Sequence, residues 1–230
     1  MEYVVNFIES IKRTPSAVSY RFSRPAGYTF NAGQFTIVSL DDDLVHPLSF
    51  SDTPEETGFI EFTKRMSDSS FCRKLQGLTV GDTITVKEPM GSFTLDKSEQ
   101  TLVLLAGGIG ITPIRSILNH LTSQQSQPDK TILIYGNINE QDIAFRDELE
   151  GLSLPGYHVV HVLTDTTGVP EAYQGFVSSE IIHKEVPDLE TAIFMVSGPP
   201  VMVEAMKKNL IDLGTTEKQI RTDLFIGYEI

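Results

Sequence analysis

The segment Ala106–Pro113, with the sequence AGGIGITP, constrains the fold of this chain more than any other feature. It follows an apolar run, 102–106, that predicts a buried strand, and it leads into apolar residues at helical spacing in 114–121. A strand, a glycine turn and a helix start bind phosphate well, because glycine lets the backbone come close and the free N–H groups of the helix face the anion. We expect Thr112 to cap this helix and Pro113 to be its first residue.

The glycine spacing differs from the G-x-G-x-x-G of ordinary dinucleotide-binding folds, since Pro113 stands where that pattern has its third glycine. The turn therefore indicates a narrower family.

Residues 1–97 are typical of a small antiparallel barrel. Short segments rich in β-branched and aromatic residues alternate with turns that contain Gly, Pro, Asn and Asp. The predicted strands are 4–11, 18–23, 34–40, 58–64 and 83–88, and one helix is predicted at 69–76.

Residues 98–230 alternate apolar strand runs with helices, which predicts a parallel sheet covered on both faces. We therefore expect two domains, an antiparallel Greek-key β-barrel over 1–97 and a doubly wound parallel α/β sheet over 98–230. The predicted strands are 102–106, 131–135, 158–163 and 192–196, and the predicted helices are 113–124, 142–149, 178–183 and 201–213.

Composition excludes several classes of function. The formal charge of −13 argues against nucleic acid and anionic membranes as partners, although it can also serve solubility alone. A single cysteine and scattered histidines predict no disulfide framework and no metal site. Apolar runs too short for a membrane span, and an N-terminus without a secretory pattern, predict a cytoplasmic protein.

Ligands on parallel sheets bind beyond the carboxyl ends of the strands. Three predicted strands end there in sequences suited to a nucleotide, namely Gly107–Gly110, Tyr135–Asn137 and Ser197–Pro200.

A barrel half followed by AGGIGITP and later by SGPP resembles the ferredoxin-NADP⁺ reductase family along the whole chain. Ala32–Phe35 is similar to the start of that family's second barrel strand, and Gly91–Phe93 to its barrel exit. The resemblance implies a barrel that holds FAD and an α/β domain that binds NADH or NADPH. Hydride would pass from the nicotinamide to the flavin, and electrons to an external acceptor: a small molecule, free flavin or a redox protein.

In that family a pattern Arg-x-Tyr-Ser holds the flavin, and the matching stretch here is His46, Pro47, Leu48 and Ser49. The resemblance implies that Ser49 hydrogen-bonds near the flavin N5, as a catalytic residue. His46 replaces the arginine that pairs with the pyrophosphate, and Leu48 replaces an aromatic ring, so both changes predict weaker binding. Leu48 can equally be ordinary barrel core.

A second implied flavin element runs from Phe62 to Phe71. Ser69 and Ser70 would donate to the FAD pyrophosphate, and Lys64 or Arg65 would supply positive charge. The two serines can also simply cap a helix.

On the nicotinamide side, Ser197–Met202 matches a family segment that begins with cysteine. Ser197 would be catalytic, and a serine there predicts lower turnover; the alternative is a plain strand-to-helix turn. The other residues that the resemblance implies for this site are Gly107, Gly108, Gly110, Ile111, Thr112, Pro113, Tyr135, Gly136, Asn137, Gly198, Pro199, Pro200 and Met202.

Asp165 stands where family members that use NADPH carry residues for the 2′-phosphate, and Ile138 replaces a further arginine. A carboxylate repels that phosphate and can accept from a ribose diol, so we expect NADH as the donor. The alternative for Asp165 is an ordinary exposed loop. Phe225 or Tyr228 would lie against the flavin where the nicotinamide lands, or else anchor the tail by packing.

Two further hypotheses remain. The changes at His46 and Leu48 favour a flavin reductase for which free flavin is a substrate. Together with Ser197, they also leave room for a reductase-like subunit that binds a nucleotide without turnover.

Overall fold

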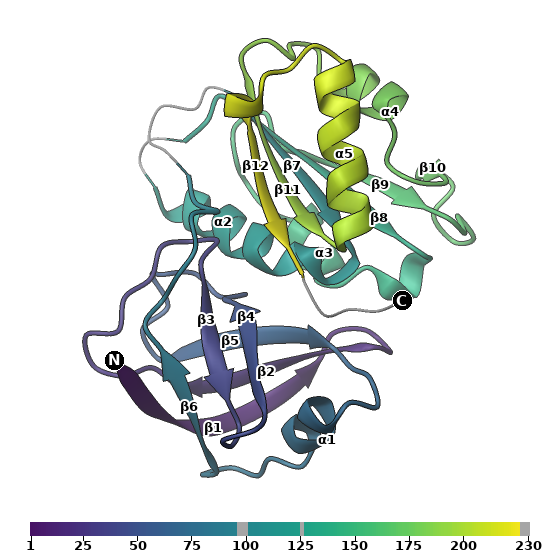
Figure 1. Cartoon of the computed structure of the whole chain (residues 1–230). Coiled ribbons are helices and arrows are strands. Elements are labelled where there is room, and N and C mark those ends of the chain that lie inside the picture. Colours follow the sequence, from purple (N-terminus) through teal and green to yellow (C-terminus); the bar gives the residue numbers. More distant parts are fainter. Residues whose placement is uncertain (96–100, 125–126, 226–230) are drawn as a thin grey trace.

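The computed structural model describes residues 1–95, 101–124 and 127–225. It consists of two sheet-based domains, one above the other (Figure 1). The predicted boundary at residues 97 and 98 falls within 96–100, outside the described residues.

The N-terminal domain is a six-stranded antiparallel sheet with the order β4-β3-β6-β1-β2-β5. A bridge between Phe50 and Phe62 joins the chain after β4 to β5, so the two edge strands meet and the sheet closes into a barrel. Rings of Phe22, Phe50 and Phe62 fill its centre. The elements are β1 (Glu2–Lys12), β2 (Ala17–Ser23), β3 (Phe35–Ser39), β4 (Val45–Ser49), β5 (Phe59–Arg65), α1 (Ser70–Gln76) and β6 (Thr83–Lys87).

The C-terminal domain is a six-stranded parallel sheet with the order β10-β9-β8-β7-β11-β12. Its strands are β7 (Thr101–Gly107), β8 (Lys130–Asn137), β9 (His158–Leu163), β10 (Tyr173–Gln174), β11 (Ala192–Gly198) and β12 (Ile220–Leu224). Its helices are α2 (Ile111–Ser123), α3 (Arg146–Glu150), α4 (Ser179–Glu185) and α5 (Pro200–Asp212), with 3₁₀ turns η1 (Gly108–Gly110), η2 (Glu140–Asp142) and η3 (Glu217–Gln219).

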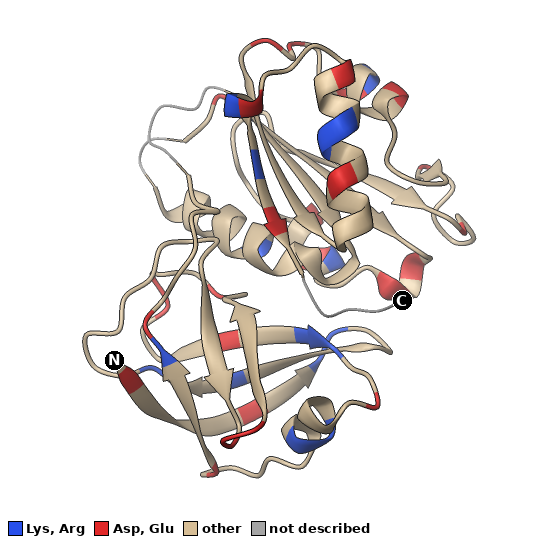
Figure 2. Ribbon diagram, in the orientation of Figure 1, with Lys and Arg blue, Asp and Glu red and all other residues tan. Residues whose placement is uncertain are grey.

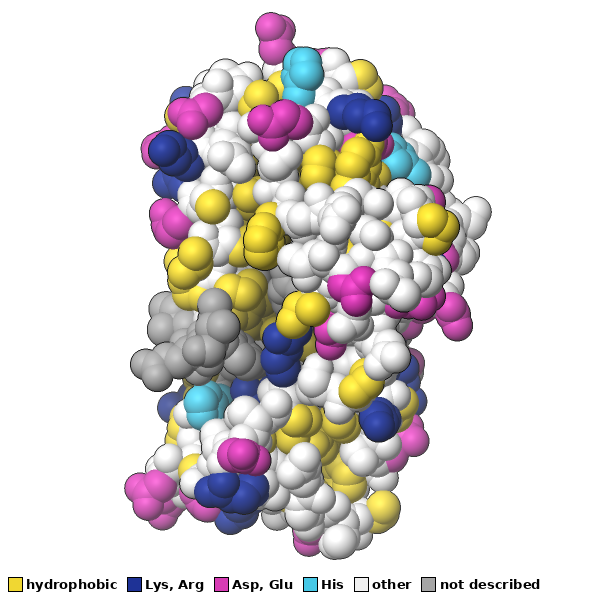
Figure 3. Space-filling model, turned by 90° about the vertical axis from the view of Figure 1, so that its right-hand side faces the viewer, with side chains coloured by type: hydrophobic (Ala, Val, Ile, Leu, Met, Phe, Trp, Pro, Cys, Tyr) yellow, Lys and Arg dark blue, Asp and Glu magenta, His cyan; other side chains and the backbone are white. Residues whose placement is uncertain are grey.

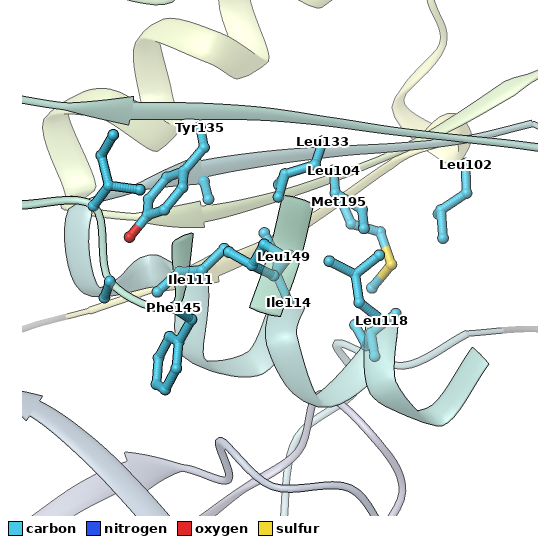
Figure 4. Close-up of a cluster of buried hydrophobic side chains, with 14 of the residues drawn as sticks. Leu102, Leu104, Ile111, Ile114, Leu118, Leu133, Tyr135, Phe145, Leu149 and Met195 are labelled. Atoms are coloured by element: carbon cyan, nitrogen blue, oxygen red, sulfur yellow. The ribbon is translucent and has the colours of Figure 1, made fainter. Parts of the chain in front are cut away.

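Both faces of this parallel sheet are covered. Helices α4 and α5 pack on one face, and α2 and α3 lie on the other, between the sheet and the barrel (Figure 1). Figure 4 shows the second of these cores, in which Leu104 and Met195 of the sheet meet Ile114 and Leu118 of α2. The predicted fold class is therefore confirmed.

The start of α2 differs from the prediction. The helix begins at Ile111 because η1 runs directly into it, and its N-cap is Gly110 rather than Thr112. The Thr112 hydroxyl instead donates to the carbonyl of Ile109 (3.1 Å). Pro113 is the third helical residue, where its missing N–H is harmless because the first turn has no intrahelical partners to lose.

Three strands were not expected: β4, β10 and β12. The expected helix at 142–149 is a 3₁₀ turn followed by the short α3, with Phe145 between them at a φ of 62°.

In the described ranges, no helix is long and apolar enough to cross a membrane.

Candidate functional site

The three strand ends that the sequence singled out lie side by side. Gly107 at the end of β7 is in register with Gly136 of β8, and Ser197 of β11 is in register with Ala106. The glycine turn, Tyr135–Asn137 and Ser197–Pro200 therefore share the carboxyl edge of the sheet, which faces the barrel (Figure 1). This is the edge at which parallel sheets bind ligands.

The glycines of the turn are required by close packing against Ser197–Met202. A Cβ on Gly107 would lie 2.0 Å from the Met202 sulfur, and one on Gly110 would lie 2.2 Å from the Ser197 carbonyl oxygen. The Tyr135 hydroxyl supports the same turn by donating to the Gly108 carbonyl (3.1 Å). Backbone and not side chains thus forms the surface offered to a ligand here.

Polar atoms without a protein partner gather at this edge. Both side-chain polar atoms of Asn137, the Ser197 hydroxyl and one carboxylate oxygen of Asp223 are buried without a hydrogen bond within the described structure. Buried polar groups normally have partners. An amide and a hydroxyl at the carboxyl edge of a parallel sheet suit a ligand with carboxamide and ribose groups, such as a nicotinamide nucleotide.

Asp223 connects this edge to the barrel. Asp223 lies on β12, in register with Ser197 of β11. Burial raises the pKa of its carboxyl to about 6, while the nearby Ser49 side chain opposes that rise. Ser49 is the last residue of β4. The residue expected at the flavin N5 thus lies at the carboxyl edge of the α/β sheet.

Lys64 and His46, both expected near the flavin, lie together beside Phe71. The His46 ring packs edge-on against Phe71 (4.4 Å), and the Lys64 ammonium lies over the same ring at 5.9 Å. Burial, and then the charge of Lys64, lower the pKa of His46, so its imidazole is neutral at pH 7. A buried cation beside a neutral ring fits a phosphate less firmly than the arginine of the family pattern.

The two serines at the start of α1 have capping contacts. Ser69 is the N-cap and accepts from the Cys72 N–H (3.2 Å), and the Ser70 hydroxyl accepts from Arg73 (3.3 Å). Both remain exposed, so these contacts leave room for a ligand.

Several of the predicted site residues have buried side chains. Phe62 is 1% exposed and belongs, with Leu48, to the barrel core, which is the alternative considered for Leu48. Ile111 belongs to the core beneath the sheet. The side chains of these residues are therefore occupied in core packing.

Asp165 lies at the carboxyl edge, beyond β9. Its N–H donates to the Ile138 carbonyl (2.8 Å), which places its loop beside the end of β8. Its exposed carboxylate accepts from the N–H of Thr167 (3.0 Å). Phe225 is half-buried and its N–H donates to the Gly198 carbonyl (3.2 Å), while Tyr228 lies outside the described residues.

Sequence reasoning missed a charged cluster between the domains. Glu61 of β5 is 0% exposed and accepts from Arg13 (3.1 Å) and Arg21 (2.8 Å) of the barrel and from Arg115 (2.8 Å) of α2. Burial alone would raise the pKa of Glu61, but the charges of Arg115, Arg13 and Arg21 lower it below its usual value.

The same Arg115 makes further contacts in both domains. It donates to both Glu148 oxygens (2.7 and 3.0 Å) and to the Ser51 carbonyl of the barrel. Its guanidinium lies 4.3 Å from the centre of the Phe145 ring, and that of Arg13 lies 4.8 Å from it. These contacts offset the left-handed backbone of Phe145, which bulky residues avoid. Figure 4 shows Phe145 on the side of its core that faces the barrel.

Figure 3 shows the face on which the two domains meet. Apolar side chains gather above and below a hollow at the junction, and a basic side chain lies at its edge. Lys and Arg residues also occupy α1 and the end of β5 (Figure 2).

Comparisons with known proteins agree with this geometry. The family model for an oxidoreductase NAD-binding domain matches residues 104–208. NADH-cytochrome b5 reductase 1 of Debaryomyces hansenii is 28% identical over 221 residues, which cover 90% of this chain and 77% of that protein. The reductase component of propane 2-monooxygenase from Rhodococcus jostii is 30% identical over 224 residues; the match covers 92% of this chain but only 60% of that protein.

The fold is similar to that of a ferredoxin NADP⁺ reductase from Neisseria gonorrhoeae solved with bound FAD and NADP. The TM-score is 0.85 and the identity 23%, with 97% of this chain and 98% of the other covered. At 23% identity, this similarity supports the fold alone.

Proposed function

We propose a reductase function from one premise: this chain belongs to the ferredoxin-NADP⁺ reductase family of oxidoreductases. The function is transfer of hydride from NAD(P)H to FAD, and of electrons from there to an acceptor outside the chain. In this proposal residues 1–97 are the FAD-binding domain and residues 98–230 bind the nicotinamide nucleotide.

The observation that carries the proposal is that the two halves of the site meet. The Ser49 side chain of the barrel lies close enough to Asp223 to lower the pKa of its carboxyl, and Asp223 is in register with Ser197 beside the glycine turn. Hydride transfer between two rings needs near-contact and alignment, and asks little else of side chains. A junction at which the flavin-side serine adjoins the nucleotide edge supplies that alignment.

FAD supplies the capacity to accept a hydride and to release electrons to the next acceptor. In this proposal the residues of the chain bind and orient FAD and the nicotinamide nucleotide. The glycine turn offers backbone N–H groups at the start of α2, and the side chains of Asn137 and Ser197 offer buried hydrogen-bonding atoms to the nicotinamide half.

NADH is the preferred donor in this proposal. Asp165 lies at the carboxyl edge beside the end of β8, and its carboxylate repels a 2′-phosphate while it can accept from ribose hydroxyls.

The acceptor is a small molecule, free flavin or a redox protein. The names of the two relatives point to different acceptors, cytochrome b5 for one and a propane monooxygenase for the other. The partner is therefore proposed only as an electron acceptor from outside the chain.

A flavin reductase that uses free flavin as a substrate is the second candidate. It is favoured by the neutral His46 imidazole at the pyrophosphate side and by Leu48, which packs in the barrel core instead of stacking on a flavin.

The visible spectrum of the purified protein tests these proposals. A yellow protein that bleaches on anaerobic addition of NADH supports the bound-flavin reductase. A colourless protein that oxidises NADH only after free FAD or FMN is added supports the second candidate. If the protein binds neither flavin nor NADH, the reductase function is wrong. Binding of both without turnover indicates the reductase-like subunit.

A further inference from the structure

Ser49 and Ser51 lie on one side of the chain that leaves β4. Between them, Phe50 stacks on Phe30 in the barrel core, with ring centres 4.0 Å apart. Since successive side chains of an extended segment point to opposite sides, the two serines face away from that core. Ser49 lies beside Asp223 of β12, and Ser51 lies against α2. This short segment therefore contacts the α/β domain at two points, two residues apart.

Arg115 of α2 makes the contact with Ser51. Its guanidinium donates to the Ser51 carbonyl and to Glu61 of β5 (2.8 Å), both in the barrel. It also donates to the two carboxylate oxygens of Glu148 in α3 (2.7 and 3.0 Å). The planar fork of a guanidinium fixes the direction of each of these hydrogen bonds. One side chain therefore fixes the barrel against the α/β domain.

The Ser51 end of this contact is fixed within the barrel. The Ser51 N–H donates to the Glu61 carbonyl (2.9 Å), and its hydroxyl donates to the Glu61 carboxylate (3.1 Å). The Glu61 N–H in turn donates to the Asp52 carboxylate (3.0 Å). Ser51 and Glu61 are both 0% exposed. The carbonyl that accepts from Arg115 is thus held by buried hydrogen bonds.

Phe145 holds the guanidinium on the side of the α/β domain. Its ring centre lies 4.3 Å from the central guanidinium carbon of Arg115, and it is the N-cap of α3, the helix that supplies Glu148. Its φ of 62° is a left-handed conformation, which a bulky residue keeps only where its surroundings impose it. Backbone strain of this kind is found where a group must be placed accurately.

Arg115 is close in the chain to the glycine turn. It lies four residues after Ile111, at which α2 begins, and η1 runs directly into that residue. The turn and the Arg115 contact therefore belong to one continuous helical segment. On the barrel side, Ser51 is two residues from Ser49. The path between the two halves of the proposed site is short, and Arg115 is its central link.

We propose that Arg115 is a positioning residue for hydride transfer, which fixes the nucleotide bound at the glycine turn relative to the flavin bound beside Ser49. It acts through the Ser51 carbonyl and Glu61 and not by contact with the reacting rings. This inference rests on the proposed function. Hydride transfer is sensitive to such placement, because a misplacement of about 1 Å can cost on the order of 100-fold in rate.

Anaerobic stopped-flow reduction by NADH of the protein saturated with FAD tests the proposal. Arg115→Lys keeps the positive charge beside Glu61 but loses the planar fork that reaches Ser51 and Glu148 at once. The rate constant of flavin reduction at saturating NADH should fall about tenfold or more. The dissociation constants of FAD and NADH should stay within about twofold, because the lost interaction aligns the ligands and does not bind them. The charge-transfer absorbance of the NADH complex should weaken, since it requires stacked rings.

His120→Gln is the matched control. His120 also lies on α2 and contacts the barrel, through exposed Glu55 (2.7 Å), but its contact involves neither Ser51 nor Glu61. Its rate constant should stay within about twofold of the wild type, because such a pair contributes little.

Glu148→Gln is a second variant, which decides the question if Arg115→Lys does not fold. The Glu148 side chain is 32% exposed, and its replacement leaves Arg115 in place without the charge of its anchor on α3. Flavin reduction should slow about threefold, because a charge-assisted hydrogen bond becomes a neutral one.

Unchanged rate constants in Arg115→Lys and Glu148→Gln overturn the inference, and so does a loss confined to the affinity for FAD or NADH. An equal fall in His120→Gln also overturns it, since any contact between the domains would then have the same effect. Failure of the proposed function looks different, because the wild-type protein itself would not bind FAD or would not be reduced by NADH.

Discussion

At the scale of single residues, Gly110 illustrates why the nucleotide turn is rich in glycine. A side chain there would meet the Ser197 carbonyl oxygen at 2.2 Å, and a backbone atom cannot move aside as the end of a flexible side chain can. Gly110→Ala should therefore lower the free energy of unfolding by about 1–3 kcal/mol. Urea denaturation measures this. Gly77→Ala is the control, because a Cβ there is no closer than 3.5 Å to any atom. Equal losses in both variants would contradict the packing argument.

Asp165 is the residue at which we expect donor choice to be made. Asp165→Arg replaces repulsion of a 2′-phosphate by attraction and should shift the ratio of kcat/KM for NADPH over NADH about tenfold or more toward NADPH. Steady-state kinetics with both donors measure the ratio. Asp188→Arg, an exposed site elsewhere on the domain, should leave it unchanged. A constant ratio in Asp165→Arg would place the 2′-hydroxyl elsewhere.

The carboxyl of Asp223 should make the free energy of unfolding fall as the pH rises. Burial raises the pKa of its carboxyl from 3.8 to about 6, so the native protein holds a proton that the unfolded chain has released between those pH values. The stabilising contribution is complete below pH 3.8 and is lost as the pH rises through 6. A shift of this size corresponds to about 3 kcal/mol.

The variant Asp223→Asn cannot ionise and should be free of this loss. Its unfolding free energy relative to the wild type should therefore increase between pH 4 and pH 7, as followed by urea denaturation at each pH. Asp188→Asn should show no such rise over this range, because the hydrogen bond from Thr191 lowers the pKa of Asp188 below 3.8, so that its titration lies at lower pH. Parallel curves for Asp223→Asn and the wild type would show that Asp223 does not titrate in this range.

At the scale of elements, β5 joins the domains through one face. Glu61 contacts α2 through Arg115, and Arg65, further along the same face, reaches η1. Glu61→Gln leaves three guanidinium groups around a neutral amide, and breaking a buried ion pair from one side costs about 3–5 kcal/mol. We expect that loss in unfolding free energy.

The control for this prediction is an exposed network. Arg146 pairs with Glu140 and Glu150 near the surface, and Arg146→Gln should change stability by about 1 kcal/mol or less. If Glu61→Gln costs no more than Arg146→Gln, the cluster between the domains does not hold them together.

The order of the main elements could be predicted from the sequence, because β-branched runs and helical spacing are local signals. The strand β4 escaped prediction because His46-Pro47-Leu48 breaks the strand pattern, and Pro47 is tolerated only because β4 pairs on one side, with β3. The opposite directions of Lys64, which lies over Phe71, and Arg65, which lies near Gly108, follow from strand alternation, but only once β5 is known to face α2. Arg115 and Glu61 are 54 residues apart in the sequence, so no local pattern predicts their contact.

At the scale of the whole molecule, the formal charge of −13 governs how acceptors approach. Charges act over a Debye length of about 30 Å at 0.01 M salt and about 10 Å at 0.1 M. A negative protein therefore attracts a basic acceptor and repels an anionic one at low salt, and both effects fade as salt is added. The basic residues of α1 and of the end of β5 do not reverse the overall sign (Figure 2).

Rates of reduction by NADH should consequently depend on salt with opposite signs for two artificial acceptors. From 0.01 to 0.1 M salt, the second-order rate constant should fall for cytochrome c, a basic protein, and rise for ferricyanide, a trivalent anion. A neutral quinone is the control, since screening leaves its encounter rate unchanged. NADH is kept at a saturating concentration, so that any effect of salt on NADH binding does not change the measured rate constants. If cytochrome c and ferricyanide respond alike, electrons leave through a local patch whose charge outweighs that of the molecule, and the basic end of β5 beside the junction is where that patch would lie.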